Sequence, residues 1–149
     1  MLQKKNKRLK LFLLTYLFFS VFSLVLAQTT NRILFIFDDS YSMYAPWNSN
    51  AKIEVAKRIM GDFLDSLSSE PNLELALRCY GHTTFFKPER NCKDSKLEIP
   101  FDNAISNAKK IKQRIQRLEP LGTTPIAYSL GECAADFPPC TNCRNIVIL

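Results

Sequence analysis

The sequence contains one histidine, no internal repeat and no low-complexity segment. A serine hydrolase would need that residue, His82, as the general base for Ser40 or Ser42, and no carboxylate is placed in the sequence to orient it. A phosphatase-type site after a strand would need a second Asp at position 40, which is Ser. These shortages favour a protein that is not an enzyme, with a hydrolase built on His82 as the alternative.

Net charge is also nearly absent once the start of the chain is set aside. Residues 1–10 hold five of the twenty basic residues and none of the fourteen acidic ones, which leaves fifteen basic against fourteen acidic residues. The positive charge of the whole chain therefore belongs to its first residues. It gives no support for nucleic-acid binding.

The first 27 residues have the composition of a signal peptide. The basic segment is followed by an apolar run at 11–26, and Val25 and Ala27 are small residues before a cut between Ala27 and Gln28. The run is short for a membrane-spanning helix, an uncleaved anchor being the alternative, and no Cys follows it to carry a lipid. We expect a mature chain of residues 28–149, without a membrane span, that is secreted, periplasmic or held at the cell surface.

Residues 28–149 are enough for one domain, in which strand and helix patterns alternate. This order predicts an α/β fold, with a Rossmann-like, mainly parallel sheet and flanking helices. Pro125 suits the first position of the last helix, which makes Thr124 its expected N-cap. Apolar runs predict strands at 33–37, 73–80, 97–101 and 144–149, and helical spacing predicts helices at about 51–67, 103–118 and 125–135.

A cluster of side-chain oxygens follows the first predicted strand. Asp38, Ser40 and Ser42 occupy alternate positions at the carboxyl end of this strand, where α/β sheets bind ligands. One carboxylate and two hydroxyls suit a hard cation, Mg2+ or Mn2+, and leave it with positive charge that a further acidic ligand can neutralise. The alternative is that the three residues only cap the turn after the strand.

This Asp-x-Ser-x-Ser pattern and the later Gly122-Thr123-Thr124-Pro125 together resemble the von Willebrand factor type A (VWA) family and its metal-ion-dependent adhesion site (MIDAS). Exported bacterial members are the most similar in character. The resemblance covers about residues 31–149 and implies a VWA fold.

The resemblance also implies roles for single residues. Ser40 and Ser42 would ligate the cation through their hydroxyls, and Asp38 would hold it directly or through water. Thr124 would supply a hydroxyl from the second metal loop, in preference to Thr123. The family's third loop brings an Asp that would lie beyond Leu149.

The other residues of the first loop have predicted roles around the metal. Strand alternation points Asp39 away from the cation, so we expect it to cap a helix or lie at the surface, with a supporting charge for the site as the alternative. Tyr41, Tyr44 and Trp47 are expected on the rim of the site, where exposed aromatic side chains commonly anchor partners. The alternative for them is packing against the helix at 51–67.

The five cysteines suggest disulfide bonding, because an exported chain meets an oxidising compartment. Cys140 and Cys143 have the spacing of a zinc knuckle, but no second pair is present, so a disulfide-bearing loop is favoured. Cys79, inside a predicted strand, is expected to be a buried free thiol. The last apolar run, 144–149, ends without a turn, so we expect a VWA domain that is incomplete at its C-terminus.

These features lead to one functional expectation and two alternatives. We expect an exported adhesion module that binds a protein partner through a Mg2+-type site, with an acidic side chain of the partner completing the coordination. One alternative is a structural VWA scaffold with a vestigial metal site. The other is the exported hydrolase that would use His82.

Overall fold

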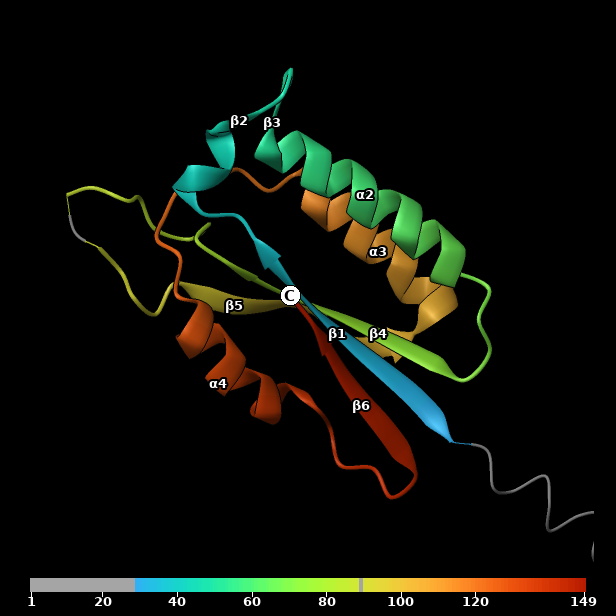
Figure 1. The fold of residues 1–149 in the computed structure, drawn as a ribbon. Coiled ribbons are helices and arrows are strands. Elements are labelled where there is room, and N and C mark those ends of the chain that lie inside the picture. The colour runs from blue at the N-terminus through green and yellow to red at the C-terminus, as the bar shows by residue number, and fades with distance from the viewer. Residues whose placement is uncertain (1–28, 89) are drawn as a thin grey trace, which may run out of the picture.

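A four-stranded sheet forms the centre of the molecule (Figure 1). The computed structural model describes residues 29–88 and 90–149, so the predicted signal peptide at 1–27 lies outside the described residues. The strands run in the order β5-β4-β1-β6. Their bounds are Thr30–Asp38 for β1, Leu73–Tyr80 for β4, Ser95–Asn103 for β5 and Cys143–Ile148 for β6.

Strand β1 is parallel to both of its neighbours, β4 and β6, whereas the edge strand β5 is antiparallel to β4. Three helices flank the sheet: α2 (Lys52–Leu67), α3 (Ala104–Gln116) and α4 (Ile126–Asp136). Figure 1 places α2 and α3 on one face of the sheet and α4 on the other. The predicted α/β fold with a mainly parallel sheet is confirmed.

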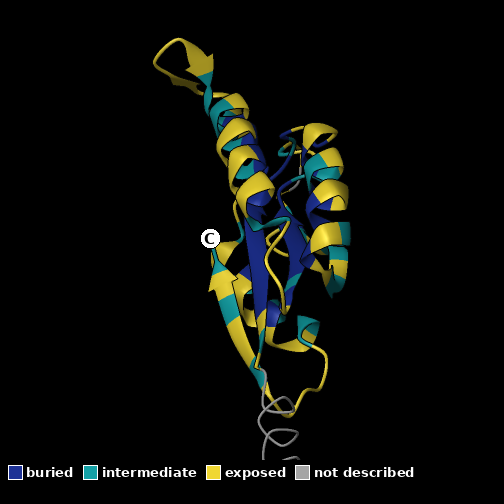
Figure 2. Cartoon of the chain, turned by 90° about the vertical axis from the view of Figure 1, so that its right-hand side faces the viewer, coloured by how far each residue is buried: buried dark blue, intermediate teal, exposed yellow. Residues whose placement is uncertain are grey.

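Alternation along β1 explains why both faces of the sheet are covered. Ile33, Phe35 and Phe37 pack into the larger apolar cluster beneath α2 and α3. Leu34 and Ile36 point the other way, into a smaller cluster on the α4 side. A strand buried on both faces needs the continuous apolar run that the sequence carries at 33–37. Figure 2 shows β1 and β4 as the most deeply buried part of the molecule.

The start of α4 differs from the sequence-based prediction. Pro125 is the N-cap and the helix begins at Ile126, so Thr124 lies outside the helix and the prediction that it is the N-cap is wrong. The reason is that the Pro125 carbonyl already accepts the N–H of Ser129 at 2.9 Å, which is the first bond of the helix. The Thr124 side chain is therefore not used in capping.

Shorter elements complete the chain. A 3-10 turn, η1 (Tyr41–Tyr44), follows β1, and the two-residue strands β2 (Pro46–Trp47) and β3 (Asn50–Ala51) form a small projecting hairpin (Figure 1). Cys140 and Cys143, in the predicted disulfide-bearing loop, are bonded to each other at the start of β6, and Cys79 is the predicted buried free thiol. Within the described ranges, every helix is too short or too polar to cross a bilayer.

Candidate metal centre

Three loops meet at the carboxyl ends of β1 and β4. The backbone of Ser40 pairs with Gly122, and the Tyr41 N–H donates to the Gly122 carbonyl at 3.0 Å. The Gly81 carbonyl, after β4, accepts the N–H groups of Leu121 and Gly122 at 3.1 and 2.7 Å. The loop after β1 and the loop before α4, which carry the two halves of the predicted site, therefore lie side by side.

Gly81 permits this close approach. Its φ is +76°, and a Cβ atom added there would lie 2.5 Å from the Thr123 carbonyl oxygen and 2.6 Å from the Ser40 Cα atom. Any other residue would combine a disfavoured backbone conformation with a clash against both loops. Glycine at this position is thus a requirement of the site's geometry.

The two serine hydroxyls converge. Ser40 Oγ and Ser42 Oγ are hydrogen-bonded to each other at 3.0 Å, which brings both oxygens within reach of one cation, and Asp38 Oδ1 accepts the backbone N–H of Ser40 at 2.8 Å. Adjacent ligands of an octahedral Mg2+ ion, with bonds of about 2.1 Å, lie about 3.0 Å apart. The donor atoms are all oxygens, the type that Mg2+ and Mn2+ prefer. The spacing and chemistry of these residues fit a hard divalent cation.

Tyr80 is a positioning residue for Asp38 that sequence reasoning missed. It is the register partner of Asp38 across the β1–β4 pair, and its side chain is buried on the same face of the sheet. Burial, and then the charge of Asp38 and a hydrogen bond to it, raise the pKa of Tyr80 well above its usual value. The tyrosine therefore stays protonated and can donate to the Asp38 carboxylate. Strand alternation could have pointed to Tyr80, but only if the register between β1 and β4 had been known.

Thr123 and Thr124 have different environments. The Thr123 hydroxyl donates to the Asn91 carbonyl, whereas Thr124 is exposed two residues beyond the Gly122 that pairs with Ser40. Thr124 is therefore better placed than Thr123 to offer a free hydroxyl. Among the residues that the structure describes, no three His, Cys, Asp or Glu side chains are grouped to hold a metal. A cation here would depend on hydroxyl oxygens and a single carboxylate.

Asp39 does not have the surface or capping role that the sequence suggested. It is fully buried, and neither carboxylate oxygen has a hydrogen-bond partner. Burial raises its pKa to about 7, against the opposing charge of Lys57. Alternation does point it away from Asp38, as predicted. The error is that this side of the strand faces the core beneath α2 and α3, as Phe37 does, and not solvent.

The three predicted rim aromatics are all exposed, by 57% for Tyr41, 50% for Tyr44 and 60% for Trp47. Tyr41 packs edge-on against Tyr44 and stacks with Phe86, with ring centroids 5.9 and 6.0 Å apart. Trp47 instead lines a groove beside α2, together with Val55. Tyr41 and Tyr44 therefore belong to one surface, and Trp47 to another.

His82 lies in a different environment from the serines. Its Nε2 atom is 2.9 Å from Glu98 Oε1, and both side chains are buried. Within residues 29–88 and 90–149, no hydrogen bond joins His82 to Ser40 or Ser42. The carboxylate partner that the sequence did not reveal comes from β5 on the antiparallel edge of the sheet.

Comparisons with known proteins identify the fold. No family model matches the sequence, and no curated protein is similar to it. The PilB minor pilin from Streptococcus sanguinis superimposes with a TM-score of 0.61 at 16% identity, covering 82% of this chain and 30% of that one. The vWF domain of the type V pili tip protein Mfa5 from Porphyromonas gingivalis gives 0.56 at 17% identity, covering 81% of this chain and 37% of that one.

A third solved structure, an uncharacterized membrane spanning protein from Vibrio fischeri, gives a TM-score of 0.51 at 19% identity, covering 71% of this chain and 48% of that one. This chain thus spans less than half the length of each of these three structures. At such identities the likeness establishes the fold alone. The chain has a VWA-like fold, as the motif resemblance implied.

Proposed function

We propose that this chain is an exported adhesion module that binds a protein partner through Mg2+ or Mn2+. The ion would be held by Asp38, Ser40, Ser42 and Thr124, and an acidic side chain of the partner would complete its coordination. The observation that most supports this proposal is the 3.0 Å separation of the Ser40 and Ser42 hydroxyl oxygens beside Asp38.

The charge balance of these residues favours an acidic partner. One carboxylate and neutral hydroxyls offset only part of a dication's charge, so the bound ion would supply an exposed positive charge for a partner's Asp or Glu. Asp38 accepts the Ser40 N–H at 2.8 Å and lies beside Tyr80, its register partner on β4, so its carboxylate is oriented before any ion binds. Ser42 and Thr124 are exposed, so an incoming side chain can reach this edge of the sheet.

The proposed cell-surface location draws on two further observations. Residues 1–27 have the pattern of a signal peptide. Two of the solved structures with this fold are a minor pilin and a pili tip protein. Attachment through a protein partner would suit a domain exposed at the cell surface.

The proposal is tested by calorimetric titration of the full chain with Mg2+ and with Mn2+. We expect saturable binding. Ser40→Ala should weaken it by about 10- to 100-fold, because the substitution removes one of the hydroxyls that would ligate the ion. Ser66→Ala is the matched control, since the Ser66 hydroxyl bonds only to the Phe63 carbonyl on the exposed side of α2.

Two results would contradict the proposal. One is the absence of ion binding in a chain whose circular dichroism shows it to be folded, which would favour the structural scaffold with a vestigial site. The other is ion binding that Ser40→Ala leaves unchanged.

A further inference from the structure

An apolar cavity of about 420 Å³ opens beside the proposed metal centre. We call it the aromatic cavity, because its walls include Tyr41, Tyr44, Phe85 and Phe86, together with Leu121. Phe85 is 71% exposed and Tyr41 57% exposed. Large aromatic side chains gathered at an open cavity leave apolar area in water that a bound side chain would cover.

The walls of the cavity are held in place without a ligand. The Phe86 N–H donates to the Leu121 carbonyl at 2.8 Å, which joins two of the wall segments. At the base of the same loop, buried Asp94 accepts the backbone N–H and hydroxyl groups of both Thr83 and Thr84. A site formed before binding loses little entropy when it is occupied.

The cavity and the metal donors share their backbone segments. Tyr41 lies between Ser40 and Ser42 in the sequence, and Leu121 precedes the Gly122 that pairs with Ser40. An extended chain advances about 3.3 to 3.6 Å per residue. A partner whose carboxylate reaches the ion can therefore place a side chain one to three residues away into the aromatic cavity.

The charge around the cavity also favours an acidic partner. Lys87 lies in the wall, and the Arg90 guanidinium sits 4.9 Å above the Phe86 ring. From Phe85 through Lys93 the sequence has three basic residues and one acidic residue. A segment rich in Asp or Glu would meet attractive charge along this loop.

We propose that the aromatic cavity receives a large apolar or aromatic side chain of the partner, one to three residues from the acidic residue at the metal. The inference rests on the proposed function and names the kind of segment that the site selects. The occupant is an extended protein segment and not a glycan, because the only side-chain hydrogen-bonding groups among the described residues of the lining are the Tyr41 and Tyr44 hydroxyls and the Lys87 ammonium, too few to pair with the many hydroxyls of a sugar.

The test measures surface plasmon resonance of the full chain over immobilised synthetic decapeptides. Each peptide has one Asp in a Gly/Ser background, with Phe placed one, two or three residues from it, and a matched peptide has Ala instead of Phe. With Mg2+ present, we expect the best Phe peptide to bind at least about tenfold tighter than its Ala counterpart, as expected for burial of one aromatic side chain.

Two variants assign this advantage to the cavity. Phe85→Ala is expected to remove most of the Phe advantage while leaving the Mg2+-dependent binding of the Ala peptide unchanged. Ile105→Ala is the matched control, because Ile105 is 74% exposed at the start of α3, which follows the end of β5 that pairs with the start of β4, away from the cavity. It is expected to retain the full advantage.

The outcomes separate failure of this inference from failure of the proposed function. If EDTA and Ser40→Ala abolish binding but Phe gives no advantage, or Phe85→Ala leaves the advantage intact, the inference is wrong and the proposed function stands. If the Phe peptide keeps its advantage in EDTA and in the Ser40→Ala variant, peptide binding does not depend on the metal, and both the inference and the proposed function are wrong. The inference is also overturned if the folded chain binds neither set of peptides. It is overturned as well if the chain binds the oligosaccharide cellotetraose, the probe for a glycan, and no peptide.

Discussion

Glu98 is the centre of a buried charge cluster beneath the loop after β4. Its carboxylate accepts hydrogen bonds from Arg114 at 2.6 Å, His82 at 2.9 Å and Lys96 at 3.1 Å. Burial acts to raise the pKa of Glu98, but the hydrogen bonds from Arg114, His82 and Lys96 outweigh it and hold the pKa at about 2. The cluster joins α3, β5 and the β4 end, and so supports the loop that carries the aromatic cavity.

This pKa makes stability depend on pH with a defined sign. Because the folded pKa of about 2 lies below the ordinary value of 4.5, Glu98 stabilises the fold fully above pH 4.5 and loses this effect as the pH falls toward 2. We expect Glu98→Gln to lower the free energy of unfolding by about 2 to 3 kcal/mol at pH 7. The difference from the wild-type chain should shrink below pH 4.5, as measured by urea unfolding at a series of pH values.

Exposed Glu70 provides the control for this prediction. Glu70→Gln should differ little from the wild-type chain at any pH in the series. A wild-type advantage over Glu98→Gln that stayed constant down to pH 2 would refute the role given to the Glu98 charge.

Single residues also show where sequence reasoning stops. The oxygens of Asp38, Ser40 and Ser42 could be predicted because their alternation and the preceding apolar run lie within one short stretch. The burial of Asp39 could not, since alternation gives the side on which a residue lies but not what covers that side. Tyr80 needs the register between β1 and β4, which the sequence does not contain.

At the scale of elements, α4 is joined to the sheet by a buried ion pair. Arg78 on β4 donates from Nε and Nη2 to the two carboxylate oxygens of Asp136, at 2.6 and 2.7 Å, and from Nη1 to Ser95 at 3.0 Å. Asp136 is the last residue of α4, and Pro138 just beyond it accepts from Arg32 at 2.7 Å. The helix that follows the loop at 121–125 is thus held at its far end by arginines of the sheet.

Removing one member of this pair leaves a buried charge without its partner. We expect Asp136→Asn to lower the free energy of unfolding by about 3 kcal/mol, measured by urea denaturation. Lys110→Gln is the control, since its ion pair with Asp102 is exposed and should give little or no change. Equal effects of the two substitutions would show that the Arg78 pair does not hold α4.

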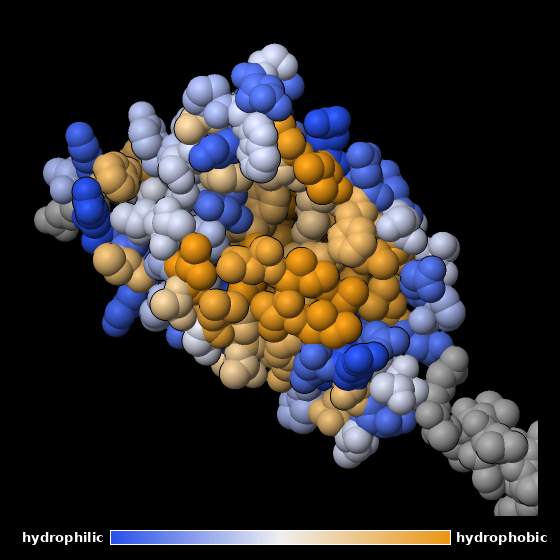
Figure 3. Space-filling view, in the orientation of Figure 1, coloured by the Kyte–Doolittle hydropathy of each residue, from blue (hydrophilic) through white to orange (hydrophobic). Residues whose placement is uncertain are grey.

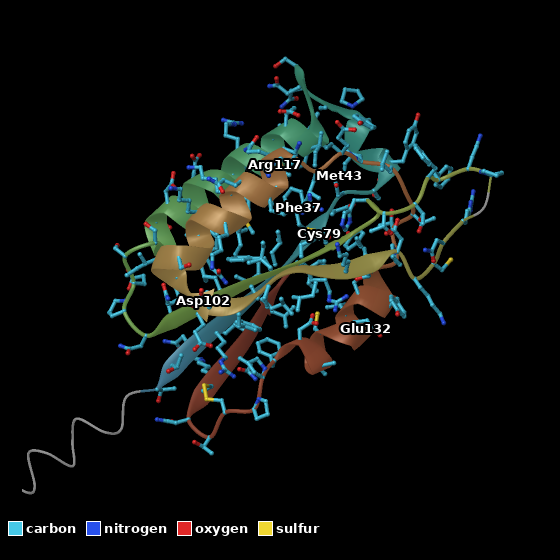
Figure 4. The ribbon with its side chains drawn as sticks, turned by 180° about the vertical axis from the view of Figure 1, so that it is seen from behind. Phe37, Met43, Cys79, Asp102, Arg117 and Glu132 are labelled. Carbon is cyan, nitrogen blue, oxygen red and sulfur yellow. A yellow bond between two sulfur atoms is a disulfide. The ribbon has the colours of Figure 1, made fainter. Side chains whose placement is uncertain are left out.

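The order of elements was more predictable than their details. Each helix and strand could be located because its periodicity is local, and all seven predicted elements are present. The direction of β5 and the first residue of α4 depend on pairing and capping bonds, which connect segments that the sequence alone does not place together. In Figure 4, Phe37, Met43 and Cys79 lie toward the site end of the sheet and Asp102 lies toward the other end.

At the scale of the whole molecule, one face is strongly apolar (Figure 3). A groove of about 400 Å³ lies there, between α2 and the end of β6. Its lining includes Trp47, Ile59, Phe63 and Leu149, which are all exposed by more than a third. Such a surface should bind apolar dyes in the native state.

We expect the folded chain to enhance the fluorescence of the dye ANS at neutral pH, and Ile59→Lys to reduce this enhancement by about half or more, because a charge would enter the groove. Ile105→Lys, at the start of α3 and outside the groove, should leave it unchanged. Near-ultraviolet circular dichroism confirms that each variant is folded. If the Ile59→Lys chain enhanced ANS fluorescence as much as the wild-type chain, the dye would bind somewhere other than this groove.

The antiparallel direction of β5 has a consequence for how this domain can diversify. Because β4 and β5 are neighbours, the segment from Gly81 to Asp94 closes on itself, with the Gly81 N–H bonded to the Asp94 carbonyl at 3.0 Å. Gly81, Phe86 and Asn91 of this segment bond to the loop at 121–123. Insertions or deletions between Phe86 and Asn91 would therefore leave the parallel strands and the proposed oxygen donors in place, at a small entropic cost. A change of length there would alter the outer rim of the proposed binding surface while both ends of the segment stay fixed.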